Sequence, residues 1–216
     1  MGLILEEHMK QKNLIKKYDK QVTMYEKNRE NPNMAAWRRK IINSAYGNIL
    51  EVGIGVGANF SHYNKEKVHV TGVDFSAEMI KSAKKAASRY QIDTELIHAD
   101  LDDLDFSPES FDCIVSTLTL CSYPDPVNTL NKFNSWCKND GKILLLEHGL
   151  SHNPFWSLTL KAIDPIYSRI AGCHCNRNIQ KIVENSKLEV ELMERHWGGI
   201  LYLIWAKPGL KPKETV

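Results

Sequence analysis

Several features that mark other classes of protein are missing from this sequence of 216 residues. No apolar run reaches the roughly 20 residues that a helix needs to cross a bilayer, and Glu6-Glu7 interrupts the apolar start at Met1 to Leu5 before it is long enough for a signal peptide. The formal net charge is only +2, so no strong attraction to nucleic acid is expected. We predict a cytoplasmic protein and leave peripheral contact with a membrane open. The sequence does not indicate an oligomeric state.

Cysteines are few, and their spacing does not define a metal-binding motif. Five cysteines without an export signal predict reduced thiols rather than a disulfide framework. Cys173-His174-Cys175 has the right side chains for zinc, but no C-x-x-C pair accompanies it. We therefore expect no metal site and interpret this segment as a loop or a pocket lining.

The G-x-G-x-x-G spacing of a dinucleotide site is also missing. The stretch from Glu51 to Gly57 instead reads E-V-G-I-G-V-G, a buried strand followed by a glycine-rich turn that lets a ligand lie against the backbone. The carboxylate of Glu51 would repel a pyrophosphate but suits a ligand with a cationic amino group. This spacing disfavours an NAD-dependent oxidoreductase, which is the first rival interpretation.

Acidic residues follow the next two apolar strands in chain order. Asp74 ends the second strand, where a doubly wound sheet places a carboxylate that binds the two hydroxyls of a ribose. Asp100 follows the apolar run 96–98, where it can accept from the exocyclic amine of adenine. Together with Glu51, these positions fit S-adenosylmethionine better than NAD.

The elements alternate between strand and helix, which predicts a doubly wound α/β fold with mostly parallel strands. The last two strands have no helix between them and should pair antiparallel. The expected strands are residues 48–52, 68–73, 94–98, 111–116, 142–147, 187–194 and 200–206. The expected helices are residues 34–44, 76–90 and 126–137, with another that starts at Ala58 and an earlier helical region around residues 14–25.

Five motifs resemble, in order and spacing, those of class I S-adenosylmethionine-dependent methyltransferases. They are Glu51-Val52-Gly53-Ile54-Gly55-Val56-Gly57, Gly72-Val73-Asp74, His98-Ala99-Asp100-Leu101, Phe111-Asp112-Cys113-Ile114-Val115 and Gly141-Lys142-Ile143-Leu144-Leu145-Leu146. The resemblance implies a Rossmann-like sheet of seven strands with an antiparallel last strand. More narrowly, residues 119–126 and 145–149, and Asp164-Pro165 followed by Gly172-Cys173-His174, look like the microsomal alkyl-thiol methyltransferases and the phospholipid N-methyltransferase-like proteins.

The resemblance also implies which residues bind S-adenosylmethionine as cofactor. Those expected at the methionine end are Glu51, Gly53, Gly55, Gly57 and Asn59. Those expected around the ribose and adenine are Asp74, Phe75, Met79, Asp100 and Leu101, while Thr117 and Leu118 form the floor beside the sulfonium and Tyr18 and Tyr25 close over the cofactor.

The resemblance divides the chain into a helical lid at 1–46, a methyltransferase domain at 47–210 and a tail at 211–216. Within the domain, residues 153–176 form an insertion whose apolar side chains recur at helical spacing, and Pro165 should break or kink it. Three interpretations stay open for this insertion. It packs on its own core, forms a lid over an apolar acceptor, or grazes a membrane.

The acceptor is a small molecule, and its chemistry can be argued from the bases that the chain offers. A thiol with a pKa of about 8.5 supplies thiolate near neutral pH, whereas an ammonium group must first lose a proton. His148 and Tyr18 are the candidate catalytic residues. We expect a small, rather apolar acceptor with a thiol favoured. The alternatives are phosphatidylethanolamine N-methylation and a non-catalytic assembly factor that binds S-adenosylmethionine.

Overall fold

The computed structural model describes residues 2–209, so the predicted tail at 211–216 lies outside the described residues. Strands form at short apolar runs, in which successive side chains point to opposite faces of the sheet. Their bounds are β1 Gly47–Val52, β2 Val68–Asp74, β3 Thr94–His98, β4 Phe111–Thr117, β5 Cys137–His148, β6 Leu188–His196 and β7 Leu201–Pro208.

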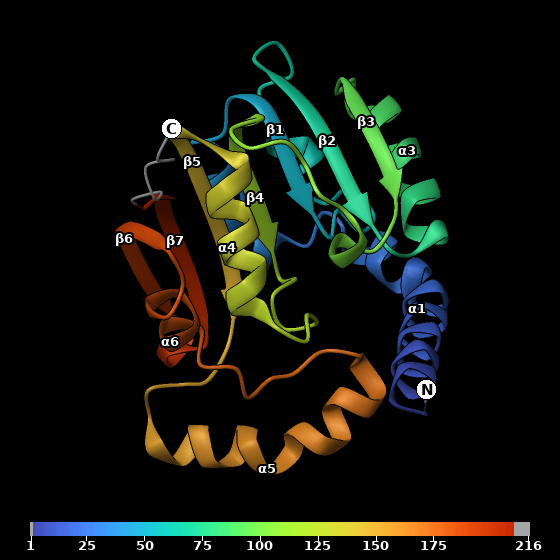
Figure 1. The fold of residues 1–216 in the computed structure, drawn as a ribbon, viewed down its shortest axis with the longest axis vertical. Helices are drawn as coiled ribbons and strands as arrows, with labels where there is room; N and C mark the ends of the chain where they lie inside the picture. The colour runs from blue at the N-terminus through green and yellow to red at the C-terminus, as the bar shows by residue number, and fades with distance from the viewer. Residues whose placement is uncertain (1, 210–216) are drawn as a thin grey trace.

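These strands build one sheet of seven strands in the order β3-β2-β1-β4-β5-β7-β6 (Figure 1). The strands β1 to β5 run parallel, and β7 lies antiparallel to both β5 and β6. The register of β6 on β7 shifts between Val190 and Leu192. The predicted fold is confirmed. The order reverses between β1 and β4, and a sheet of this kind binds ligands outside the carboxyl ends at such a point.

Helices cover both faces of the sheet. Their bounds are α1 Gly2–Asn28, α2 Pro32–Ile42, α3 Ala77–Tyr90, α4 Pro126–Trp136, α5 Pro154–Ala171 and α6 Ile179–Glu184. One core packs Leu130 and Phe133 of α4 and Ile179 of α6 against the sheet, and the other packs Ile41 of α2 and Ala83 of α3 against the opposite face.

Two elements lie away from these faces and bear on the site. Figure 1 shows α5 (orange) passing beyond the carboxyl ends of the parallel strands, with one end near α1 (blue). Lys17 Nζ of α1 donates to the carbonyls of Ser168 and Arg169 in the last turn of α5. A cation suits the carbonyl end of a helix, so this contact stabilises the meeting of α1 and α5.

Two expected element boundaries were wrong. No α-helix starts at Ala58; a 3-10 turn at Phe60–His62 takes its place, because β2 already begins at Val68 and leaves little chain for a helix. The strand β5 begins at Cys137, which pairs with Phe111, rather than at residue 142.

Pro165 lies inside α5 without ending it, and Figure 1 shows the helix bent along its length, in agreement with the predicted kink rather than a break. A proline removes one backbone hydrogen bond, and a helix can absorb that loss by bending. Asn153 caps its start and Gly172 ends it. Within residues 2–209, none of the helices combines the length and the apolar character required to span a bilayer.

Candidate active site

A cavity of about 1280 Å³ opens where the carboxyl ends of β1, β2, β3 and β4 meet α1 and α5. Single small-molecule sites usually measure roughly 300–1,000 Å³, so this volume has room for a cofactor and an acceptor together. Thirteen of the residues that the sequence predicted line it: Tyr18, Tyr25, Glu51, Gly53, Gly55, Asp74, Phe75, Met79, Asp100, Leu101, Thr117, Leu118 and His148.

The glycines of the turn after β1 serve different purposes. Gly53, Gly55 and Gly57 all have a positive φ, a backbone conformation that favours glycine. A Cβ on Gly55 would meet only Gly53 O, at 3.9 Å, so this glycine leaves open space toward the cavity. A Cβ on Gly57 would lie 2.6 Å from the ring of Phe60, and Gly57 does not line the cavity. The prediction that Gly57 meets the cofactor is therefore corrected, because close packing against Phe60 requires it.

The carboxylate of Asp74 ends β2 beside this turn. Its two oxygens accept from the backbone N–H groups of Gly55 and Ser76, each at 2.9 Å. Burial raises the pKa of Asp74 to about 6, although these two hydrogen bonds favour the ionised form. A ribose diol would supply the donors that the remaining lone pairs lack.

Glu51 is the centre of a buried hydrogen-bonded network. It accepts from Asn59 Nδ2 and from the hydroxyl of Tyr63, both at 2.8 Å. Arg38 of α2 donates at 2.8 Å to Asn59 Oδ1 and at 2.9 Å to Thr117 Oγ1. Burial raises the pKa of Glu51 to about 7 against the effect of these donors. Asn59 is fully buried and holds Glu51 instead of lining the cavity, which corrects its predicted role.

Asp100 lies at the adenine end that the sequence predicted, where α1 also reaches. Its Oδ2 accepts from Gln11 Nε2 at 2.6 Å and its Oδ1 accepts from the N–H of Asp102 at 3.0 Å. The carboxylate therefore fixes the 3-10 turn at Leu101–Asp103 and links it to the first helix.

The floor of the cavity follows β4. Leu118 adopts a φ of +59°, a strained angle for a side chain of this size. Behind it the buried Glu147 accepts from Ser116 Oγ at 2.8 Å and from the N–H of Thr119 at 3.1 Å. Burial raises the pKa of Glu147 to about 7. These contacts fix the loop after β4.

Aromatic residues from α1 cover the cavity. The ring of Tyr18 meets Phe75 edge to face at 5.2 Å, and its hydroxyl lies 2.7 Å from Ser122 Oγ. Burial raises the pKa of Tyr18 far above its usual value, so the phenol stays protonated and acts as a hydrogen-bond donor. Arg29 donates to the carbonyl of Val56 at 2.9 Å and so ties α1 to the glycine turn.

His148 ends β5 at the cavity, as predicted, and meets two thiols there. Its imidazole and the sulfurs of Cys121 and Cys173 all lie within 4.8 Å of one another. Burial lowers the pKa of His148, but its hydrogen bond with Cys173 reverses that effect and leaves the pKa above its usual value. Hydrogen bonds with Cys121 and then His148 hold the pKa of Cys173 below its usual range.

Sequence reasoning missed Arg38, Gln11 and the meeting of Cys121 with Cys173. Cys121 was noticed only as part of a motif, and 52 residues separate it from Cys173. No local pattern in the sequence indicates a contact over such a separation.

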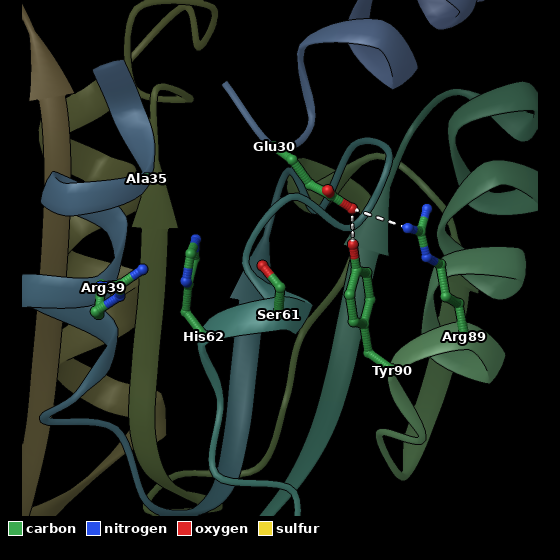
Figure 2. A pocket seen from close by; sticks show the side chains of 7 residues that line it. All are labelled: Glu30, Ala35, Arg39, Ser61, His62, Arg89 and Tyr90. Carbon is green, nitrogen blue, oxygen red and sulfur yellow. Dashed lines mark hydrogen bonds and ion pairs between the residues drawn. The ribbon is translucent and has the colours of Figure 1, made fainter. Parts of the chain in front are cut away.

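A shallower hollow lies apart from this cavity, between α2, α3 and the 3-10 turn at Phe60–His62 (Figure 2). Figure 2 shows the carboxylate of Glu30 joined to the hydroxyl of Tyr90 and to Arg89, which lies 3.4 Å from it. These groups already satisfy one another, and the glycine turn does not line this hollow.

The residues of the large cavity fit S-adenosylmethionine. Gly55 leaves a cradle that a side chain would fill, Asp74 presents a carboxylate at the end of β2, and Glu51 lines the same cavity from β1. Residues 50–145 match the family described as a methyltransferase domain. Together with the fold and the cavity, this match identifies the protein as an S-adenosylmethionine-dependent methyltransferase.

Individual relatives are similar over different lengths. Phosphatidylethanolamine N-methyltransferase of Cereibacter sphaeroides is 28% identical over 151 residues, which cover 69% of this chain and 73% of that protein. The mitochondrial methyltransferase OMS1 of Saccharomyces cerevisiae is 27% identical over 88% of this chain, which spans only 44% of the yeast protein's length.

Among solved structures, geranyl diphosphate C-methyltransferase from Streptomyces coelicolor, in complex with S-adenosyl-L-homocysteine, superposes with a TM-score of 0.66. It is 14% identical, and the match covers 81% of this chain and 79% of that one. At this identity the similarity shows a shared fold.

Proposed function

We propose that this methyltransferase acts on a small, rather apolar acceptor, with a thiol favoured. The distribution of charge around the cavity carries the proposal. Among the described lining residues, every carboxylate lies near the carboxyl end of β1 or β2 or in the segment after β3, on the cofactor side: Glu51, Asp74, Asp100, Asp102 and Asp103. The wall formed by α5 and the loop after it contributes Tyr167, Arg169, Cys173 and His174 and no carboxylate.

Among the described residues that line the α5 side, an acceptor therefore meets no carboxylate that could pair with an ammonium group. Bringing an unpaired ammonium out of water is costly, whereas a thiol or a thiolate has no need of a carboxylate. Cations and hydroxyl donors on this wall instead suit a thiolate, which carries its negative charge before the methyl group arrives. This difference favours sulfur over a primary amine.

The bound cofactor supplies an electrophilic methyl group on its sulfonium, and the chain must position the acceptor in line with it. We assign this positioning to Tyr18 and Ser122, whose paired hydroxyls lie 2.7 Å apart at the cavity. His148 is the second proposed catalytic residue, because it reaches the cavity from the end of β5 next to the floor residue Leu118.

Phosphatidylethanolamine is the second candidate acceptor, and one feature of α5 favours it. Seven large apolar side chains of α5 are exposed, including Phe155 and Ile170 at 70% and Ile166 at 66%. With 3.6 residues per turn, these side chains fall on about half of the helix circumference. Such a face suits the surface of a lipid bilayer, from which a lipid amine would enter the cavity. The bacterial relative named as a phosphatidylethanolamine N-methyltransferase is consistent with this alternative.

An acceptor screen tests the proposal. Release of S-adenosylhomocysteine is measured with aryl and alkyl thiols in detergent-free buffer, and in parallel with vesicles that contain phosphatidylethanolamine. We expect turnover of thiols, with a rate that rises toward the pKa of each thiol, so that acidic thiols keep their activity at lower pH. Turnover of the vesicles without any methylated thiol would reverse the order of the two acceptors. Cofactor binding without release from any acceptor would favour an assembly factor.

A further inference from the structure

We propose that Cys121, His148 and Cys173 form a binding site for a single Zn²⁺ ion at the floor of the cavity. Their ligand atoms lie within 4.8 Å of one another. Each comes from a different segment: the loop after β4, the end of β5 and the loop after α5. Cys121 is buried, while the other two line the cavity beside the cofactor-binding residues.

Backbone contacts hold the two cysteine loops together. The N–H of His174 donates to the carbonyl of Cys121 at 3.1 Å, and Arg177 Nη2 donates to the carbonyl of Tyr123 at 2.7 Å. Cys173 therefore lies opposite Cys121 through contacts that do not involve either sulfur. A metal site needs ligands held in place by such supporting contacts, because mobile ligands lose entropy on binding.

The neighbouring side chains of the loop after α5 are engaged elsewhere. Asp164 accepts from the N–H of Cys175 at 2.7 Å through Oδ1, and its Oδ2 lies 2.9 Å from His174 Nδ1. The sulfur of Cys175 donates to the carbonyl of Leu160 at 3.4 Å. The ligand set therefore differs from the Cys173-His174-Cys175 cluster that is visible in the sequence, and only Cys173 belongs to both.

Two thiolates and one imidazole select Zn²⁺ among the common ions, since Ca²⁺ and Mg²⁺ prefer oxygen ligands. Zinc sites in proteins usually have four ligands, and a site with three protein ligands leaves one position for water or a substrate. Because His148 and Cys173 line the cavity, this fourth position faces it. The donor set and its exposure are those of a reactive site rather than a closed structural one.

The open position suits an acceptor thiol, a consequence that rests on the proposed function. On binding Zn²⁺, the thiol would release its proton to water and stay bound as a thiolate. This would explain how a cavity without a carboxylate on its acceptor side can hold a deprotonated acceptor. It also gives His148 the role of a ligand in place of a general base.

Cobalt titration tests the site without any acceptor. The full chain is treated with a chelator and a reductant, and Co²⁺ is added anaerobically, since tetrahedral Co²⁺ with thiolate ligands has characteristic absorption bands. We expect one Co²⁺ per chain, displaced by Zn²⁺. Cys121→Ser, Cys173→Ser and His148→Gln should each weaken binding by at least about 100-fold, because the loss of even an outer-shell partner costs roughly 10–100-fold. Cys175→Ser is the matched control and should bind as the wild type does.

Folding of each variant is checked by its thermal shift on addition of S-adenosylhomocysteine. The proposal fails if the reduced wild type gives no cobalt–thiolate bands, or if Cys175→Ser loses as much affinity as Cys173→Ser. The role of the metal in holding the acceptor fails if the metal-free enzyme methylates thiols at the full rate, which would leave the proposed function standing. Cobalt bands in a protein that turns over no thiol would support the site and count against the proposed function.

Discussion

Asp74 combines two tasks within one side chain. It holds the glycine turn through the N–H of Gly55, and it presents its carboxylate to the cavity. We expect Asp74→Ala to weaken S-adenosylmethionine binding by about 1.5–3 kcal/mol, because charge-assisted hydrogen bonds to the ribose are lost. Calorimetry measures this loss. Asp93→Ala, which removes an exposed carboxylate next to His69, should leave the affinity unchanged. Unaltered binding by a folded Asp74→Ala variant would move the ribose site elsewhere.

The pKa of Asp74 also predicts how the affinity depends on pH. Burial raises this pKa to about 6 in the protein without cofactor. The ribose hydroxyls need the ionised carboxylate as acceptor, so affinity should be constant well above pH 6 and fall as the pH drops through that value. Calorimetry from acidic to neutral pH should show this step in the wild type. Asp74→Asn should lack the step, and a step that persists in this variant would assign it to another group.

Substitutions at two glycines of the turn should separate an effect on cofactor binding from an effect on the free energy of unfolding. Gly55→Val should abolish cofactor binding, since the side chain would fill open space next to the cavity. Gly57→Ala should lower the free energy of unfolding more, because its Cβ would overlap Phe60 in addition to the cost of about 1–2 kcal/mol for a left-handed residue. Chemical denaturation and calorimetry on both variants give the two readouts. Equal losses of stability would contradict the difference in surroundings.

At the scale of elements, the strands could be predicted more reliably than the helices and turns between them. Buried strands such as β1 and β4 are short apolar runs, a pattern that depends on local sequence alone. The expected helix at Ala58 is replaced by the 3-10 turn at Phe60–His62, which no local pattern indicated. In α5, Asn153 caps the start and Gly172 ends the helix, and the helix bends instead of ending at Pro165 (Figure 1).

The exposed apolar half of α5 leads to a testable prediction about membrane contact. Replacing Phe155 and Trp156 together by serine should reduce co-sedimentation with anionic vesicles, because two large apolar side chains that are 70% and 54% exposed are lost. Turnover of a soluble thiol should be unaffected. The matched control replaces Val190 and Leu192 of β6, which are also exposed but lie on another element. Equal loss of sedimentation in both double variants would argue against a specific role for α5.

At the scale of the whole molecule, the buried carboxylates connect the site to stability. Burial raises the pKa of Glu51 from its usual 4.5 to about 7 in the folded protein. Between these values the folded state keeps a proton that the unfolded chain has released, so this contribution to stability falls as the pH rises and is constant above about pH 7. Glu51→Gln should remove up to about 3 kcal/mol of this pH dependence. Denaturation curves at several pH values compare the two proteins, and parallel profiles would contradict the assignment.

A site residue could be found in the sequence where it directly follows or ends a predicted strand. The glycine turn, Asp74 and Asp100 follow strand ends and could be found by their order along the chain. Other site residues come together only when the chain folds, because distant loops and helices converge at the same end of the sheet. Arg38 reaches the site from α2, and Cys121 meets Cys173 from a separate loop. Sequence order therefore found the lining residues at the strand ends and missed those that distant segments bring together.

The edge strand β6 affects how the molecule behaves at high concentration. An exposed strand edge can template pairing with another chain and so begin a fibril. The register shift between Val190 and Leu192 disturbs that edge, and Glu189 and Glu191 flank the shift with carboxylates that lie 3.0 and 3.9 Å from Lys207 Nζ. A register shift and charged side chains make the β6 edge a poor template for a strand of another chain. Resistance to aggregation is thus built into the strand farthest from the cofactor turn.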